Sequence, residues 1–128
     1  MKKEIDLGYV AMYKYKPTDR LTPLWLEKMH EDDGKPQKPV DPNETVLAPG
    51  NYDVVLDHPF NTELRQQLPV GAIGMTRRQL VALIVKLYRK ASKNPKKYGI
   101  WAHCFGDLML HTATLDTKTG NITVSCDS

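Results

Sequence analysis

Residues 76–93, TRRQLVALIVKLYRKASK, are the most regular segment of this 128-residue chain. Thr76 and Gln79 have the spacing of a capping box, in which each side chain bonds the backbone N–H of the other residue, so we expect a helix to begin after Thr76. Apolar residues then recur at intervals of three and four, which places them on one helix face. They are Leu80, Leu83, Ile84, Leu87, Tyr88 and Ala91. This stripe predicts a long amphipathic helix packed on a sheet, and it ends before Asn94-Pro95.

Strand patterns lie on both sides of this helix. Residues 5–16 alternate along the chain and carry three tyrosines on one side, which is typical of a strand. Residues 44–48 and 51–57 predict two further strands. We expect short helices at residues 22–29 and 62–67, because capping residues precede them and a breaker follows.

The C-terminal third predicts a three-stranded meander. Its strands are residues 100–105, 108–115 and 122–126, joined by short turns that carry glycine. The order of elements favours an α+β fold, with a mainly antiparallel sheet packed on the long helix. We expect a single domain over residues 1–128, with a long proline-rich loop at residues 30–50.

Composition excludes several classes of protein. The longest apolar run, residues 80–85, has six residues, far fewer than the ~20 that cross a bilayer. The basic N-terminus is not followed by the apolar segment of a secretion signal. With its two cysteines we therefore expect a cytoplasmic chain with reduced thiols, and we expect no cofactor and no metal.

The net charge of +3 conceals an uneven distribution. Residues 64–106 contain nine basic residues and no acidic residue, so the rest of the chain sums to −6. Residues 27–63, which precede this basic segment, themselves carry a net −6. The two segments either neutralise each other in the fold or face different partners.

The long helix carries the candidate binding residues. At 100° per residue, most of its cations fall opposite the apolar stripe. Lys86/Lys90 and Arg89/Lys93 are like-charge pairs one turn apart, and each costs the helix roughly 0.2–0.5 kcal/mol. The candidates for binding an anionic partner are Arg77, Arg78, Lys86, Arg89, Lys90 and Lys93. The alternative interpretation is a solvated helix face.

The loop before the helix is a second candidate. Gly71, Gly74 and Thr76 precede Arg77 and Arg78 at a helix N-terminus, where free N–H groups attract anions. The alternative is a tight connection in which the glycines permit turns and Thr76 caps its own helix.

The predicted meander also brings two reactive side chains together. With a four-residue second loop, His111 lies opposite Cys126, which is compatible with an activated thiol nucleophile. The alternative is a core edge with small thiols and a hydrogen-bonded histidine.

We therefore predict a small binding module that recognises an acidic or anionic macromolecule through its basic helix face. The alternative function is nucleic-acid binding by the same surface, and an enzyme that uses the Cys/His cluster or the glycine loop is the third hypothesis. A helix-turn-helix built from residues 62–67 and 76–93 is disfavoured, because its connection is longer than the three or four residues of that motif.

Overall fold

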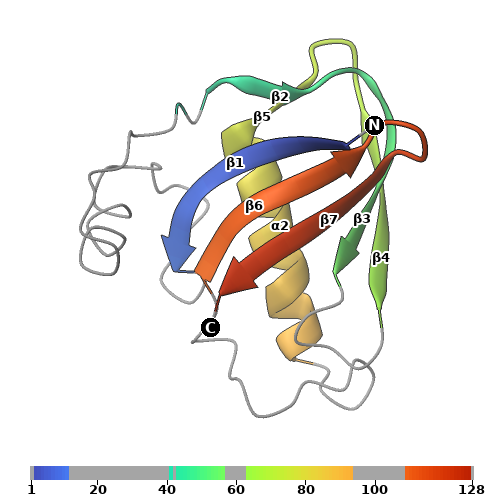
Figure 1. Ribbon diagram of the computed structural model, residues 1–128. Coiled ribbons are helices and arrows are strands. Elements are labelled where there is room, and N and C mark those ends of the chain that lie inside the picture. Colours follow the sequence, from blue (N-terminus) through green and yellow to red (C-terminus); the bar gives the residue numbers. More distant parts are fainter. Residues whose placement is uncertain (1, 12–40, 42, 57–62, 94–108, 128) are drawn as a thin grey trace.

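The computed structural model contains a five-stranded sheet with a single described helix packed on one face (Figure 1). The structure describes residues 2–11, 41, 43–56, 63–93 and 109–127. The elements are β1 (Lys2–Ala11), β2 (Thr45–Leu47), β3 (Gly50–Leu56), β4 (Leu64–Val70), β5 (Met75–Thr76), α2 (Arg77–Ser92), β6 (Met109–Asp116) and β7 (Asn121–Asp127). The helix expected at residues 22–29 and the strand expected at 100–105 lie outside the described residues.

The sheet is mixed but mainly antiparallel. Its order is β1-β6-β7-β3-β4, and β3 and β7 are the parallel neighbours. A separate short ladder joins β2 to β5. The expected combination of a mainly antiparallel sheet with one long helix is therefore confirmed for this part of the chain.

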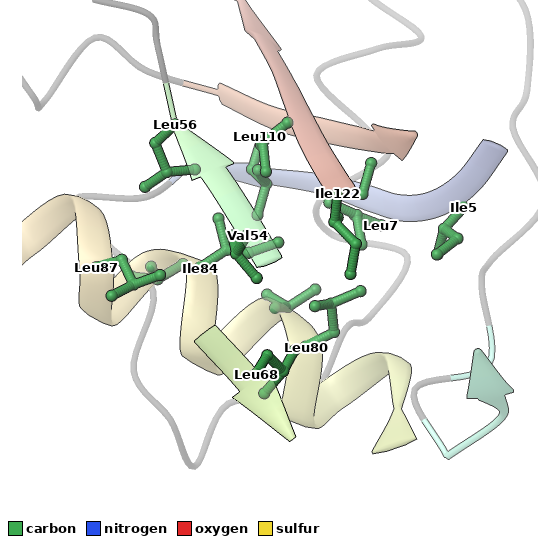
Figure 2. Close-up of a cluster of buried hydrophobic side chains, with 14 of the residues drawn as sticks. Ile5, Leu7, Val54, Leu56, Leu68, Leu80, Ile84, Leu87, Leu110 and Ile122 are labelled. Atoms are coloured by element: carbon green, nitrogen blue, oxygen red, sulfur yellow. The ribbon is translucent and has the colours of Figure 1, made fainter. Parts of the chain in front are cut away.

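Helix α2 begins as its sequence predicts. Thr76 is the N-cap, and both hydrogen bonds of the capping box with Gln79 are present. The buried face of α2 differs from the predicted stripe at its two borders. Val81 and Val85 are buried in addition to the predicted residues, whereas the predicted Leu83 is only half-buried. Sheet side chains point toward this stripe in Figure 2 and form one apolar core with it. Its members include Ile5, Leu7, Val54, Leu56, Leu68, Leu80, Ile84, Leu87, Leu110 and Ile122.

The prediction of a short helix at residues 62–67 is wrong. Residues 64–67 belong to β4, which pairs with β3 through seven consecutive partners from Leu56↔Leu64 to Gly50↔Val70. Leu64, Leu68 and Val70 are buried at even spacing, so cross-strand pairing and burial override the helix propensity of the intervening glutamines. The helix-turn-helix hypothesis fails with it, because its first helix is a strand.

Strand β4 is an edge of the sheet, and its outer side is partly blocked. Pro69 lies opposite Asn51 and has no N–H to donate, so these two residues form a non-hydrogen-bonded pair of the ladder. The backbone N–H and C=O groups at the odd-numbered positions of β4 therefore point away from β3. The outward carbonyl of Gln67 accepts a hydrogen bond from Gln66 Nε2 at 3.1 Å. Both features reduce the capacity of this edge to pair with another strand.

The part of the predicted C-terminal meander that the structure describes is the pairing of β6 with β7. Strands β6 and β7 form the expected hairpin, with Leu115 opposite Ile122 and Ala113 opposite Val124. The other side of β6 pairs with β1 from Lys2↔Asp116 to Asp6↔Thr112 and again at Val10↔Leu110 and Ala11↔Met109, with a register shift between Asp6 and Val10. Strand β6 therefore lies between β1 and β7 in the described sheet, and the strand expected at residues 100–105 is outside the described part of the chain.

Candidate functional site

Three lysines form the exposed part of the predicted basic face. Lys86, Lys90 and Lys93 are exposed on the side of α2 away from the core, and we call them the lysine stripe. Within the part of the chain that the structure describes, no carboxylate lies within ion-pair distance of them. Arg78 and Arg89 are half-buried at the border of the stripe. The stripe therefore presents three like charges on one helix face.

Arg77 does not belong to this surface, which corrects the prediction that it binds a partner. It is 7% exposed. Its Nε donates to the Asp6 carbonyl of β1 at 2.6 Å, and its Nη1 donates to the Asp41 carbonyl. Its Nη2 contacts Glu44 Oε1 at 3.3 Å. The burial of Arg77 could have been predicted from a helical wheel, because Arg77 falls within the apolar arc and not on the polar side.

The contacts of Arg77 are structural ones that the sequence did not reveal. Asp6, Asp41 and Glu44 lie 71, 36 and 33 residues from it. No local spacing links such distant positions, and two of the acceptors are main-chain carbonyls that every residue type carries. Arg77 therefore joins the start of α2 to β1 and to the segment before β2.

The ion pairs of the described residues join the two charged segments of the chain. Arg65 pairs with Asp53 at 3.4 Å and with Glu63 at 3.0 Å, while Arg77 pairs with Glu44 at 3.3 Å. Each pair couples a cation of residues 64–106 to a carboxylate of residues 27–63. Internal neutralisation thus operates at Arg65 and Arg77, and the lysine stripe lies apart from these pairs.

The loop before α2 has the geometry of a tight connection. Gly74 has φ +76°, and a Cβ at this position would lie 2.7 Å from the Leu47 carbonyl oxygen. Its N–H donates to the Gly71 carbonyl at 2.9 Å and closes the turn. Glycine is therefore required at position 74 for both conformation and space.

The backbone donors at the start of α2 are engaged by protein acceptors. The N–H of Thr76 bonds Gln79 Oε1 at 2.9 Å, and the N–H of Gln79 bonds Thr76 Oγ1 at 3.3 Å. The N–H of Arg77 bonds the Glu44 carbonyl at 2.9 Å. An anion at this terminus would have to displace these acceptors, so the geometry favours the capping interpretation of Thr76.

The expected pairing of His111 with Cys126 is wrong. Leu110 lies opposite Cys126 and Thr112 opposite Ser125, so His111 is the extra residue of a bulge in β6. Without the bulge, residue 111 would lie opposite Cys126 in the row of residues that faces the core. With the bulge, Leu110 takes that place, and Leu110 is fully buried. An apolar side chain thus occupies the core position. Among the described residues no group of three or more His, Cys, Asp or Glu is arranged to hold a metal ion.

Comparison of the chain with protein-family models, with curated proteins and with solved structures finds no match. Among the described helices, none has the length and apolar character needed to cross a membrane.

Proposed function

We propose that this protein is a small binding module that recognises an acidic segment of a partner protein through the lysine stripe of α2. The observation that carries the proposal is the separation of the cations into two groups. Arg65 and Arg77 are engaged by carboxylates of the same chain, whereas Lys86, Lys90 and Lys93 are exposed and have no such partner among the described residues.

The geometry of the stripe suits an extended or helical acidic segment. Lys86 and Lys93 are seven residues apart, which at 1.5 Å per residue spans about 10 Å along the helix axis. Lysine stems are long and their ammonium groups are point charges, so they adapt to carboxylates of varied spacing. Ala82 and Leu83 are half-buried and pack against the core beside the stripe, and they add an apolar contact.

Electrostatic energy also supports a role outside the folded chain. The like-charge pair Lys86/Lys90 costs α2 roughly 0.2–0.5 kcal/mol, and the helix has no acidic residue in its first turn to complement its dipole. A partner that supplies carboxylates removes this repulsion on binding. The association should therefore weaken as salt screens the charges.

Nucleic-acid binding by the same surface is the alternative outcome of the test. Single-stranded nucleic acids favour aromatic side chains on which bases stack. The aromatic residue of α2, Tyr88, is 1% exposed and belongs to the core. The enzymatic hypothesis rested on the Cys/His cluster or the glycine loop, and the observed register does not place His111 opposite Cys126.

The test is a binding titration with a matched charge control. Fluorescence anisotropy would follow a labelled glutamate-rich peptide and a labelled oligonucleotide at about 50 and 200 mM salt. We expect the peptide to bind, and we expect a variant with Lys86, Lys90 and Lys93 all changed to Gln to lose about 1–3 kcal/mol of binding free energy, roughly five- to 150-fold in affinity. The control changes Lys2, Lys3 and Lys118 to Gln, three exposed lysines elsewhere on the chain, and should leave affinity within about twofold.

Two outcomes would contradict the proposal. An equal loss of peptide affinity in both triple variants would mean that the net charge of the protein, and not the lysine stripe, determines binding. Binding of the oligonucleotide without binding of the peptide would establish the nucleic-acid alternative instead.

A further inference from the structure

A polar hollow lies where the turn between β6 and β7 meets β3 and β4. Its volume is about 400 Å³, within the range of small-ligand sites. Asn51 and Asp53 of β3, Gln67 and Pro69 of β4, and Thr119 of the turn line it. Figure 1 shows this turn at the end of the sheet where the N-terminus lies, beside β3. None of these residues belongs to the lysine stripe.

The wall formed by the turn is held in place by backbone contacts. The N–H of Asp53 bonds the Gly120 carbonyl at 2.9 Å, and the N–H of Gly120 bonds the Asp116 carbonyl at 2.8 Å. Gly120 has φ +77°, and a Cβ there would lie 3.0 Å from the Asn51 carbonyl oxygen. The hollow is therefore formed before any ligand arrives, which lowers the entropic cost of binding.

Its side chains offer both hydrogen-bond donors and acceptors. Asp53 lies opposite Gln67 and Asn51 opposite Pro69, so all four occupy the sheet face opposite α2. The carboxamides of Asn51 and Gln67 are exposed and make no hydrogen bond to another described residue. The Thr119 hydroxyl accepts from the N–H of Asn121 at 3.3 Å and keeps its own proton to donate.

Charge and polarity restrict the class of ligand. The Asp53 carboxylate repels an anion, and the Arg65 guanidinium, 3.4 Å from that carboxylate, repels a cation. Of the apolar residues that line the hollow, Leu68 is almost fully buried and Tyr52 is half-buried, so the Pro69 ring is the main apolar surface open to a ligand. Carboxamides and hydroxyls both donate and accept, and so do the hydroxyls of a sugar.

We propose that this hollow binds a small neutral polyol of the monosaccharide class. The Asp53 carboxylate accepts from sugar hydroxyls, which gives the stronger, charge-assisted type of hydrogen bond. The carboxamides of Asn51 and Gln67 hydrogen-bond the remaining hydroxyls, and the Pro69 ring contacts the apolar face of the sugar. The site shares no residue with the lysine stripe, so a failure of this proposal leaves the proposed function untouched, and the reverse also holds.

The test is an NMR titration of the ¹⁵N-labelled full chain with glucose, galactose and mannose, each added alone. We expect at least one sugar to shift the amides of Asn51, Asp53 and Thr119 with saturation, at a dissociation constant on the order of millimolar. Asn51→Ala and Gln67→Ala should each weaken binding at least about fivefold, equivalent to one lost hydrogen bond. Gln66→Ala is the matched control, since this exposed carboxamide on β4 does not line the hollow.

Acetate and methylammonium serve as charged probes of the same amides. Saturable shifts with either ion, but with none of the sugars, would overturn the proposal. Linear shifts with every sugar, or equal weakening by Gln66→Ala, would overturn it as well.

Discussion

Replacing Arg77 with methionine would remove the guanidinium that joins α2 to β1 and to the segment before β2. Its side chain is 9% exposed, and it donates to the carbonyls of Asp6 and Asp41. A hydrogen bond from a charged donor contributes about 1.5–3 kcal/mol. Two such bonds are lost, and methionine partly offsets the loss because it avoids desolvation of a buried charge. We therefore expect the free energy of unfolding to fall by about 2–4 kcal/mol.

Urea denaturation followed by far-ultraviolet circular dichroism measures this loss. A domain of this size has about 5–15 kcal/mol of stability, so the variant should still fold, with its midpoint lower by about 1–2 M urea. Glu44→Gln is the control, because the Glu44 side chain is 53% exposed and such an ion pair contributes about 0–1 kcal/mol. A loss below about 0.5 kcal/mol for Arg77→Met, or an equal loss for Glu44→Gln, would refute the assignment of the stability to the carbonyl contacts.

Three further substitutions test other parts of the structure. Lys86→Glu replaces the repulsion of Lys90 with an attractive pair one turn apart and should raise the free energy of unfolding by about 0.4–1 kcal/mol in urea denaturation; a decrease would contradict the cost assigned to the stripe. Gly74→Ala should lower the same quantity by at least about 1–2 kcal/mol, because its left-handed backbone and the nearby Leu47 carbonyl exclude a Cβ. Gly71→Ala, with open space around it, should stay within about 1 kcal/mol of the wild type, and equal losses for both glycines would refute the argument. Pro69→Thr adds an outward N–H to the β4 edge and should increase self-association in sedimentation velocity, whereas an unchanged sedimentation coefficient at all concentrations would mean that proline does not protect this edge.

Local patterns predicted those elements whose stability depends on neighbours in the chain. The capping box of Thr76 and Gln79 and the apolar stripe that follows it place α2 within a residue of its observed bounds. The alternation around Tyr52 predicted β3, and the hairpin of β6 and β7 was predicted with its register as far as Ala113. Each of these features follows from interactions between residues that are close in sequence.

Local patterns failed where a distant segment decides the conformation. The residues of β4 have no strong strand propensity, and they are extended because β3 offers a complete ladder. The bulge at His111 places Leu110 in the buried row of the sheet, and it coincides with a register shift of β1 between Asp6 and Val10, which is distant in sequence. The exposed cations of the candidate site were identified from the helical wheel, but the burial of Arg77 was not.

For this chain, sequence periodicity alone was enough to define an amphipathic helix and most of the strands. The distribution of charged residues along the chain showed the strongly uneven charge. Tertiary structure decided which charges are free to act. Arg77 and Arg65 are engaged by carboxylates from the preceding segment, while Lys86, Lys90 and Lys93 remain on the solvent side of α2. The reason is physical: helix geometry sets the face on which a residue lies, but only the packing of distant strands determines which faces are covered and by which groups.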